Sequence, residues 1–297
     1  MTDPAFIRSI ESSIAQATGE NFRIVKTTSA GGGCINSAYR LLGENRSYFV
    51  KVNAQNLLPM FEAEAAGLRE IIATGTVKAP EPVCHGVAGG QAYLVMEYLD
   101  LGSGRGTVGR VLGEQLADMH RVPQPYFGWH RDNTIGSTHQ PNEPGDDWTT
   151  FWAEHRLGFQ LELAARDGYG GRLQRNGEKL VEKLPALFDG YTPQPSLLHG
   201  DLWGGNWGSA GQGQPAIFDP ACYYGDREAD IAMTELFGGF GGDFYAAYRG
   251  AFPLDAGYGT RKILYNLYHI LNHLNLFGGS YLGQAESMID RLLSGLR

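Results

Sequence analysis

The feature that most constrains this chain is a pair of short runs that contain aspartate, HGDLWGGN at residues 199–206 and AIFDPA at residues 216–221. Four residues separate Asp201 from Asn206, and Asp219 follows the strand-like segment 216–218. Taken singly, each run would be explained as a turn or a helix cap. Taken together, they supply a carboxylate that can accept a hydroxyl proton and two oxygen ligands for Mg²⁺, which are the groups that phosphoryl transfer requires. We therefore predict Asp201 as a catalytic base and Asn206 and Asp219 as metal ligands.

The first hundred residues indicate a sheet accompanied by helices. Apolar residues recur every three or four positions in residues 3–18 and 57–74, which predicts two helices. Strand-like segments bounded by Gly, Asn and Pro turns lie at residues 22–29, 37–42, 47–52, 82–87 and 92–99. We expect an antiparallel sheet that one helix, residues 57–74, interrupts after the third strand.

The composition changes after Leu99 to the glycine-rich run LGSGRGT, which is typical of a connection between lobes. The rest is mainly helical, with helices expected at residues 106–121, 148–167, 172–188, 227–237, 244–252, 260–277 and 283–296. Residues 122–147 form a long structured loop. The prediction is an α+β protein with a two-lobed protein-kinase-like fold. Residues 1–100 would form the nucleotide-binding lobe of antiparallel sheet with one key helix, and residues 101–297 the mainly helical catalytic and substrate-binding lobe.

Further residues are placed to bind a nucleotide. The turn between the first two predicted strands contains four small residues, Gly31, Gly32, Gly33 and Cys34. Such a turn lets backbone N–H groups approach phosphate oxygens, although alone it is weak evidence, since it departs from G-x-G-x-x-G. Lys51 strengthens the prediction, because a lysine between Val50 and Val52 in a strand needs a partner, and phosphates provide one.

That lysine predicts an acidic partner on the following helix. Glu62 and Glu64 are both candidates, and Glu64 is favoured because it lies on the sheet-facing side. The adenine is expected at the end of the last strand, where Glu97 C=O and Leu99 N–H would hydrogen-bond to it and Met96 would line the back of its pocket. The implied cofactors are ATP and Mg²⁺.

Composition excludes several other classes of protein. The formal net charge of -8 and the absence of a basic stripe argue against nucleic-acid binding. The N-terminal residues lack a signal-peptide pattern and the apolar runs are too short to span a bilayer, so we expect no membrane association and a cytoplasmic location. Cys34, Cys84 and Cys222 match neither a disulfide framework nor a zinc site and are expected to be reduced.

Two departures from protein kinases refine the prediction. Gly200 precedes Asp201 at the position where phosphorylation-regulated kinases have arginine, and only a few residues separate Asp219 from the helix expected near Arg227. An activation loop has no room there. A metabolite kinase that is always competent therefore fits better than a signalling enzyme.

Four segments, HGDLWGGN, FDPACYYGDREADIAM, GGGCINSAYRL and LNHLNLFGG, together resemble the fructosamine kinase family, the ketosamine 3-kinases, which are related to aminoglycoside and choline kinases. The resemblance runs from about Ile10 to Leu292. It implies phosphorylation of a sugar ketoamine, a fructosamine or ribulosamine that is free or protein-bound, at its O3 hydroxyl, which destabilises the adduct and serves deglycation.

The resemblance also implies roles for individual residues. It assigns Asp201 as catalytic base, Asn206 and Asp219 as metal ligands, and Lys51 with Glu64 as the phosphate-binding pair. Trp203 would lie against the sugar, although the chemistry allows a core anchor equally. Asn133 and His273 fall in segments near the substrate, where buried structural hydrogen bonding is the alternative for His273. By the same resemblance Cys34 would support a redox-sensitive dimer, and a monomer is the alternative.

Two rival functions are kept open. An aminoglycoside- or choline-type kinase would bind a cationic substrate through carboxylates, and Glu154, Glu162 and Asp167 are available, but interleaved basic residues dilute them. A non-catalytic nucleotide-binding scaffold would be expected to lack the lysine, the base or a metal ligand. This chain has all of them.

Overall fold

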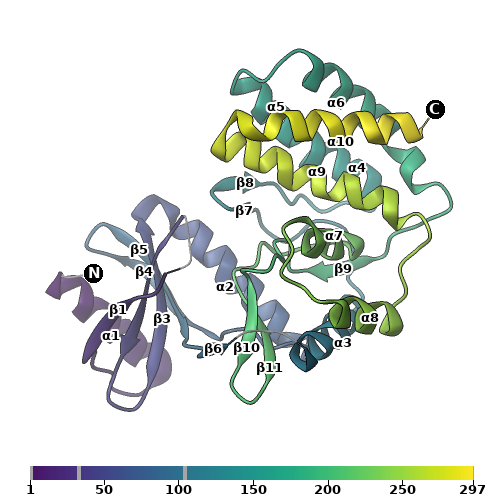
Figure 1. Cartoon of the computed structure of the whole chain (residues 1–297). Helices are drawn as coiled ribbons and strands as arrows, with labels where there is room; N and C mark the ends of the chain where they lie inside the picture. The colour runs from purple at the N-terminus through teal and green to yellow at the C-terminus, as the bar shows by residue number, and fades with distance from the viewer. Residues whose placement is uncertain (1–2, 32–34, 103–105, 297) are drawn as a thin grey trace.

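The computed structural model describes residues 3–31, 35–102 and 106–296, and it has an antiparallel sheet in its N-terminal part and a mainly helical C-terminal part (Figure 1). The α+β architecture expected from the sequence is confirmed. Helix α1 (Pro4–Thr18) begins where the Asp3 carboxylate accepts a hydrogen bond from Ala5 N at 3.0 Å, and it ends at Gly19, whose φ of 73° suits glycine.

The N-terminal sheet is antiparallel with strand order β1-β2-β3-β5-β4. Its strands are β1 (Lys26–Ser29), β2 (Ser37–Leu42), β3 (Ser47–Ala54), β4 (Pro82–Ala88) and β5 (Gln91–Glu97). The first strand is shorter than the predicted 22–29, because Phe22 packs edge-to-face on Tyr48 and Ile24 N donates to the Glu11 carboxylate at 2.8 Å instead of joining the ladder. Leu99 lies just beyond β5, which ends at Glu97.

The two faces of this sheet pack on different helices. Val50, Val52 and Val95 share a cluster with residues of α1, whereas Leu94 and Met96 pack with residues of α2 (Leu58–Ala73). Because successive residues of a strand point to opposite faces, Lys51 must point to the α2 side. Helix α2 lies between the sheet and the C-terminal part (Figure 1).

The C-terminal part is built mainly of helices around one core. Its α-helices are α3 (Thr107–Arg121), α4 (Trp148–Trp152), α5 (Phe159–Arg166), α6 (Arg172–Lys183), α7 (Glu228–Leu236), α8 (Gly242–Ala251), α9 (Tyr258–Phe277) and α10 (Leu282–Gly295). The helix predicted at 148–167 is interrupted by a π-helical turn, Ala153–Gly158. In the ranges that the structure describes, no helix combines the length and the apolar character needed to cross a membrane.

Short strands, most of which the sequence did not predict, connect these helices. They are β6 (Leu101–Gly102), β7 (Asn133–Ile135), β8 (Thr138–Gln140), β9 (Pro195–Leu198), β10 (Trp207–Ala210), β11 (Gln214–Ile217) and β12 (Tyr223–Asp226). They form the small sheets β11-β10-β6, β12-β9 and β7-β8. Each has at most four residues, too few for a clear alternation. The lobe boundary at residue 100 stays a prediction.

A buried polar network lies beneath β7 and β8. The Arg156 guanidinium, on the π-helical turn, is fully buried and donates to Pro141 O and Asn142 Oδ1, both at 2.7 Å. Its carbon atom Cζ also lies 4.1 Å from the centre of the Tyr223 ring. Carbonyl and amide oxygens and aromatic faces thus compensate the charge of Arg156.

Arg156→Met is expected to lower the free energy of unfolding by about 3 kcal/mol, because the Pro141 carbonyl and the Asn142 side chain lose a buried donor. Urea unfolding measures the change. Arg166→Met is the matched control, since Arg166 pairs with Glu162 on the exposed surface of α5, and its change should stay within about 0.5 kcal/mol. Equal effects of the two substitutions would contradict this account of the network.

Candidate active site

Lys51 lies at the centre of the candidate site. It is 6% exposed, and its Nζ atom is 2.7 Å from Glu64 Oε1 and 2.6 Å from Asp219 Oδ1. Burial alone would lower the pKa of Lys51, but the Asp219 and Glu64 carboxylates outweigh it and raise that pKa above its ordinary value. The ammonium therefore stays charged, and it joins the sheet, α2 and the segment after β11.

The structure also distinguishes the two glutamates proposed as partners of this lysine. Glu64 points to Lys51 and is buried, whereas Glu62 pairs at 3.2 Å with Arg131 at the surface. Burial raises the pKa of Glu64, and the Lys51 ammonium counteracts that effect.

Asp201 and Asn206 are brought together by a tight turn after β9. Asn206 Nδ2 donates to the Asp201 backbone carbonyl at 2.8 Å and to Asp201 Oδ2 at 3.2 Å. Within the described ranges no donor is hydrogen-bonded to Asn206 Oδ1, so this oxygen is available to a cation. Burial and the nearby Asp219 carboxylate raise the pKa of Asp201 well above its ordinary value, which increases its affinity for a proton.

His199 links the two acidic segments of the site. Its Nε2 donates to Phe218 O at 2.9 Å, and its Nδ1 accepts from Asp201 N at 3.2 Å. Burial lowers the pKa of His199, so the ring is neutral and carries its proton on Nε2. The imidazole thereby sets the spacing between the loop of Asp201 and the residue preceding Asp219.

A buried aspartate of α7 anchors the loop. Asp230 accepts hydrogen bonds from His199 N at 2.7 Å and Gly200 N at 2.9 Å, and His120 Nε2 lies 3.2 Å from its carboxylate. Burial alone would raise the pKa of Asp230, but its interactions with His120 and His199 and the hydrogen bond from Gly200 N outweigh that effect and hold the pKa below its ordinary value. Asp230 was not predicted, although an acidic residue within the apolar run ADIAM was a signal for it.

The nucleotide-side residues are less completely described. Gly31 is exposed two residues beyond the end of β1, whereas Gly32, Gly33 and Cys34 lie outside the described residues. Met96 is buried on the α2 side of the sheet, and the Glu97 carboxylate pairs with Lys78 Nζ at 3.0 Å. Strand β5 pairs with β3 so that Leu94 lies opposite Lys51, and Met96 and Glu97 follow two and three positions further along β5.

The predicted substrate residues have different environments. Trp203 is 39% exposed, and His273 lies against the rings of Phe237, Phe277 and Tyr281 with centroids 4.9–5.4 Å apart. Asn133 is buried, its Nδ2 donates to Cys222 O at 2.7 Å, and its Oδ1 accepts from Gln140 and Asn142. These bonds favour a structural role for Asn133 over the substrate contact expected from the resemblance.

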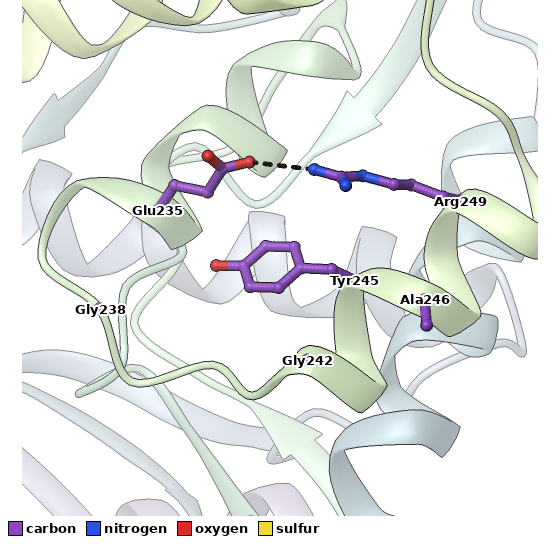
Figure 2. A pocket seen from close by; sticks show the side chains of 6 residues that line it. All are labelled: Glu235, Gly238, Gly242, Tyr245, Ala246 and Arg249. Atoms are coloured by element: carbon purple, nitrogen blue, oxygen red, sulfur yellow. Dashed lines mark ion pairs between the residues drawn. The ribbon is translucent and has the colours of Figure 1, made fainter.

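Glycines join the loop of Trp203 to the segment after α7. A Cβ atom on Gly204 would lie 2.8 Å from Gly238 O, so these two segments are in close contact. Gly238 also lines a surface pocket between α7 and α8, in which Tyr245 lies beside the ion pair of Glu235 and Arg249 (Figure 2). The predicted site residues do not line this pocket.

The backbone conformation and surroundings of Gly200 explain why arginine cannot occupy this position before Asp201. Its φ is 80°, and a Cβ atom there would lie 2.1 Å from Ala221 O. The loop of Asp201 can therefore approach the segment after Asp219 only because this side chain is absent.

Gly200→Ala is expected to lower kcat by about 10²-fold, because Asp201 or Asp219 must shift by on the order of 1 Å to relieve the contact. Gly190→Ala is the matched control. Gly190 has a φ of 74°, but a Cβ atom there would lie more than 4 Å from every neighbouring atom in the described ranges, so only the backbone strain of about 1–2 kcal/mol remains. Steady-state kinetics give kcat, and thermal melts give the stability, of each of the two variants. Similar turnover of the two variants would contradict the role of the close contact.

Solved structures resemble this fold over nearly its full length. A crystal structure assigned to fructosamine-3-kinase from Haemophilus somnus superposes with a TM-score of 0.89 at 29% identity, covering 97% of this chain and 98% of that one. The choline kinase LicA from Streptococcus pneumoniae superposes with a TM-score of 0.61 at 14% identity, covering 97% and 98% of the chains. The second likeness concerns the fold alone, and the predicted protein-kinase-like fold is confirmed.

Comparison of sequences is more specific. A probable ketoamine kinase from Synechocystis sp. is 48% identical over 294 residues, which are 99% of each chain. The chloroplastic protein-ribulosamine 3-kinase of Arabidopsis thaliana is 44% identical over 283 residues, which are 94% of this chain and 86% of the relative. The model of the fructosamine kinase family matches residues 6–295. The chain therefore belongs to the fructosamine kinase family.

Proposed function

We propose that this protein transfers the γ-phosphoryl group of ATP to the O3 hydroxyl of a sugar ketoamine, a ribulosamine or fructosamine. The observation that carries the proposal is the convergence of Lys51, Asp219 and Asp201 where the sheet meets the helical part. The names of the relatives, ketoamine kinase and protein-ribulosamine 3-kinase, support this substrate class. The oligomeric state and the cytoplasmic location expected from the sequence stay predictions.

Lys51, Asn206 and Asp219 would bind the triphosphate end of the nucleotide. Glu64 holds the Lys51 ammonium in place, so the lysine can contact phosphate oxygens without a change of rotamer. Asn206 Oδ1 and the Asp219 carboxylate, whose side chain is 43% exposed, are hard oxygen donors of the kind that Mg²⁺ prefers. Asn206 and Asp219 would thus hold a Mg²⁺, which would supply positive charge against the phosphates.

Asp201 would act on the acceptor hydroxyl. Its raised pKa increases its affinity for the proton that leaves O3, and the contact of Asn206 Nδ2 with Oδ2 fixes the orientation of the carboxylate. Asp230 accepts from the backbone N–H groups of His199 and Gly200, and the His199 ring accepts from that of Asp201, so the base is fixed before substrate binds.

The sugar and its amine substituent would meet an aromatic surface. Trp203 follows Asp201 by two residues and is partly exposed, as is Phe237, which contacts His273. Such rings can stack on the apolar face of a sugar. His273 Nδ1 bonds to His269 O at 2.7 Å, which leaves Nε2 for a polar group of the substrate.

Asp201→Asn is expected to lower kcat by about 10²-fold to 10⁴-fold, because the amide cannot accept the hydroxyl proton. The substitution preserves the size of the side chain and one oxygen, so the thermal unfolding midpoint and the Kd for ADP should change little. Turnover at the wild-type rate would rule out the assigned base.

The reaction itself is tested by coupled ADP release with a ribulosamine, a fructosamine, kanamycin and choline as acceptors. We expect the highest kcat/KM with a ketoamine. A 3-O-methyl ketoamine is the matched control, since a methyl group replaces the hydrogen of the accepting hydroxyl and the compound should bind without turnover. Preference for kanamycin or choline, or equal turnover of the 3-O-methyl compound, would refute the proposed substrate and position.

A further inference from the structure

One carboxylate joins the end of helix α2 to the helical part of the chain. Glu70 accepts a hydrogen bond from Trp129 Nε1 at 2.6 Å through one oxygen, and another from the Tyr224 hydroxyl through the other. Glu70 lies on the helix that carries Glu64, whereas both donors belong to the helical part. None of these three residues is used by the proposed reaction.

The two donors are held rigidly by their own backbone. Gly128 and Tyr224 exchange two hydrogen bonds, with N···O distances of 2.9 Å and 2.7 Å, which fixes the segments of Trp129 and Tyr224 side by side. Trp129 is 1% exposed and its backbone N–H donates to Asn142 O at 2.8 Å. The indole N–H and the phenol O–H therefore form a preset pair of donors for a single carboxylate.

Helix α2 makes a second close contact in the same region. A Cβ atom on Gly67 would lie 2.9 Å from Cys222 Sγ, so the helix backbone packs directly on the segment that follows Asp219. Glu64, Gly67 and Glu70 are spaced by three residues and lie on successive turns of the helix. The helix surface that holds Lys51 thus continues into the surface that contacts the helical part.

We propose that Glu70 is a positioning residue that fixes α2 on the helical part and so holds Glu64 against Lys51 before nucleotide binds. The inference rests on the proposed function, in which Lys51 binds phosphates. In regulated kinases, movement of the corresponding helix makes and breaks the lysine–glutamate pair. Here the Glu70 carboxylate, shared by Trp129 and Tyr224, keeps the pair formed without an activating event.

Glu70→Gln tests this role with an isosteric change. The amide cannot accept from both donors with two oxygens, so one hydrogen bond and the charge assistance are lost. We expect kcat to fall by about 10-fold and the Kd for a fluorescent ADP analogue to rise several-fold. Amide hydrogen exchange should accelerate in residues 58–73 but not in α9.

Glu62→Gln is the matched control, because Glu62 lies on the same helix and its partner Arg131 also belongs to the helical part, but their side chains are 36% and 32% exposed. For Glu62→Gln, kcat, the Kd for the ADP analogue and the amide hydrogen exchange of residues 58–73 should stay within two-fold of wild type. Tyr224→Phe removes one of the two donors to Glu70. In the double variant with Glu70→Gln, it should change kcat and the Kd for ADP by a smaller factor than it does alone.

The proposal is overturned if Glu70→Gln retains wild-type kcat, ADP affinity and exchange of α2, if exchange accelerates equally throughout the chain, or if the two substitutions act additively. ADP affinity and hydrogen exchange do not depend on the acceptor. An inactive wild-type protein with ketoamines would therefore refute the proposed function while these two measurements still decide the role of Glu70.

Discussion

The structure depends on one buried ammonium held between two carboxylates. Removing Lys51 and Glu64 from water is unfavourable unless the geometry is good, and the distances from Lys51 of 2.7 Å to Glu64 and 2.6 Å to Asp219 meet that condition. The three residues come from β3, α2 and the segment after β11. Burial of the charge is therefore possible only when the sheet, the helix and the catalytic segment are assembled together, which links folding to the formation of the site.

Residues 219–224 form the segment that contacts Lys51 of the sheet, helix α2 and the loop of Asp201. Asp219 bonds to Lys51, Ala221 O occupies the space that a side chain on Gly200 would need, and Cys222 packs on Gly67 of α2. Tyr224 then bonds to Glu70. Asn133 and Gln140 donate to the Cys222 and Ala221 carbonyls of the same segment, and Asn142 links Asn133 to the buried Arg156. This short connection stands where regulated kinases have an activation loop, and contacts on several sides fix it in the structure.

Much of the fold and of the candidate site could be predicted from the sequence, because the groups that perform chemistry are few and their spacing is informative. The α+β architecture, the helix between β3 and β4 and the inward-pointing Lys51 follow from periodicity. Most strands of three or four residues could not be predicted, since a segment that short has no clear period. Asp230, Arg156 and Glu70 were missed for another reason: each acts through partners that are distant in the chain, such as Tyr224, 154 positions after Glu70.

The contrast between fixed and exposed groups suggests how such an enzyme can vary its substrate. The backbone around Asp201 is bonded to Asp230 and His199, so substitutions that disturb it also disturb the chemistry. Trp203 and Phe237 project from the same region with 39% and 43% of their surfaces exposed. A change of acceptor can therefore be achieved by replacing exposed rings, while the base and the phosphate-binding lysine keep their geometry.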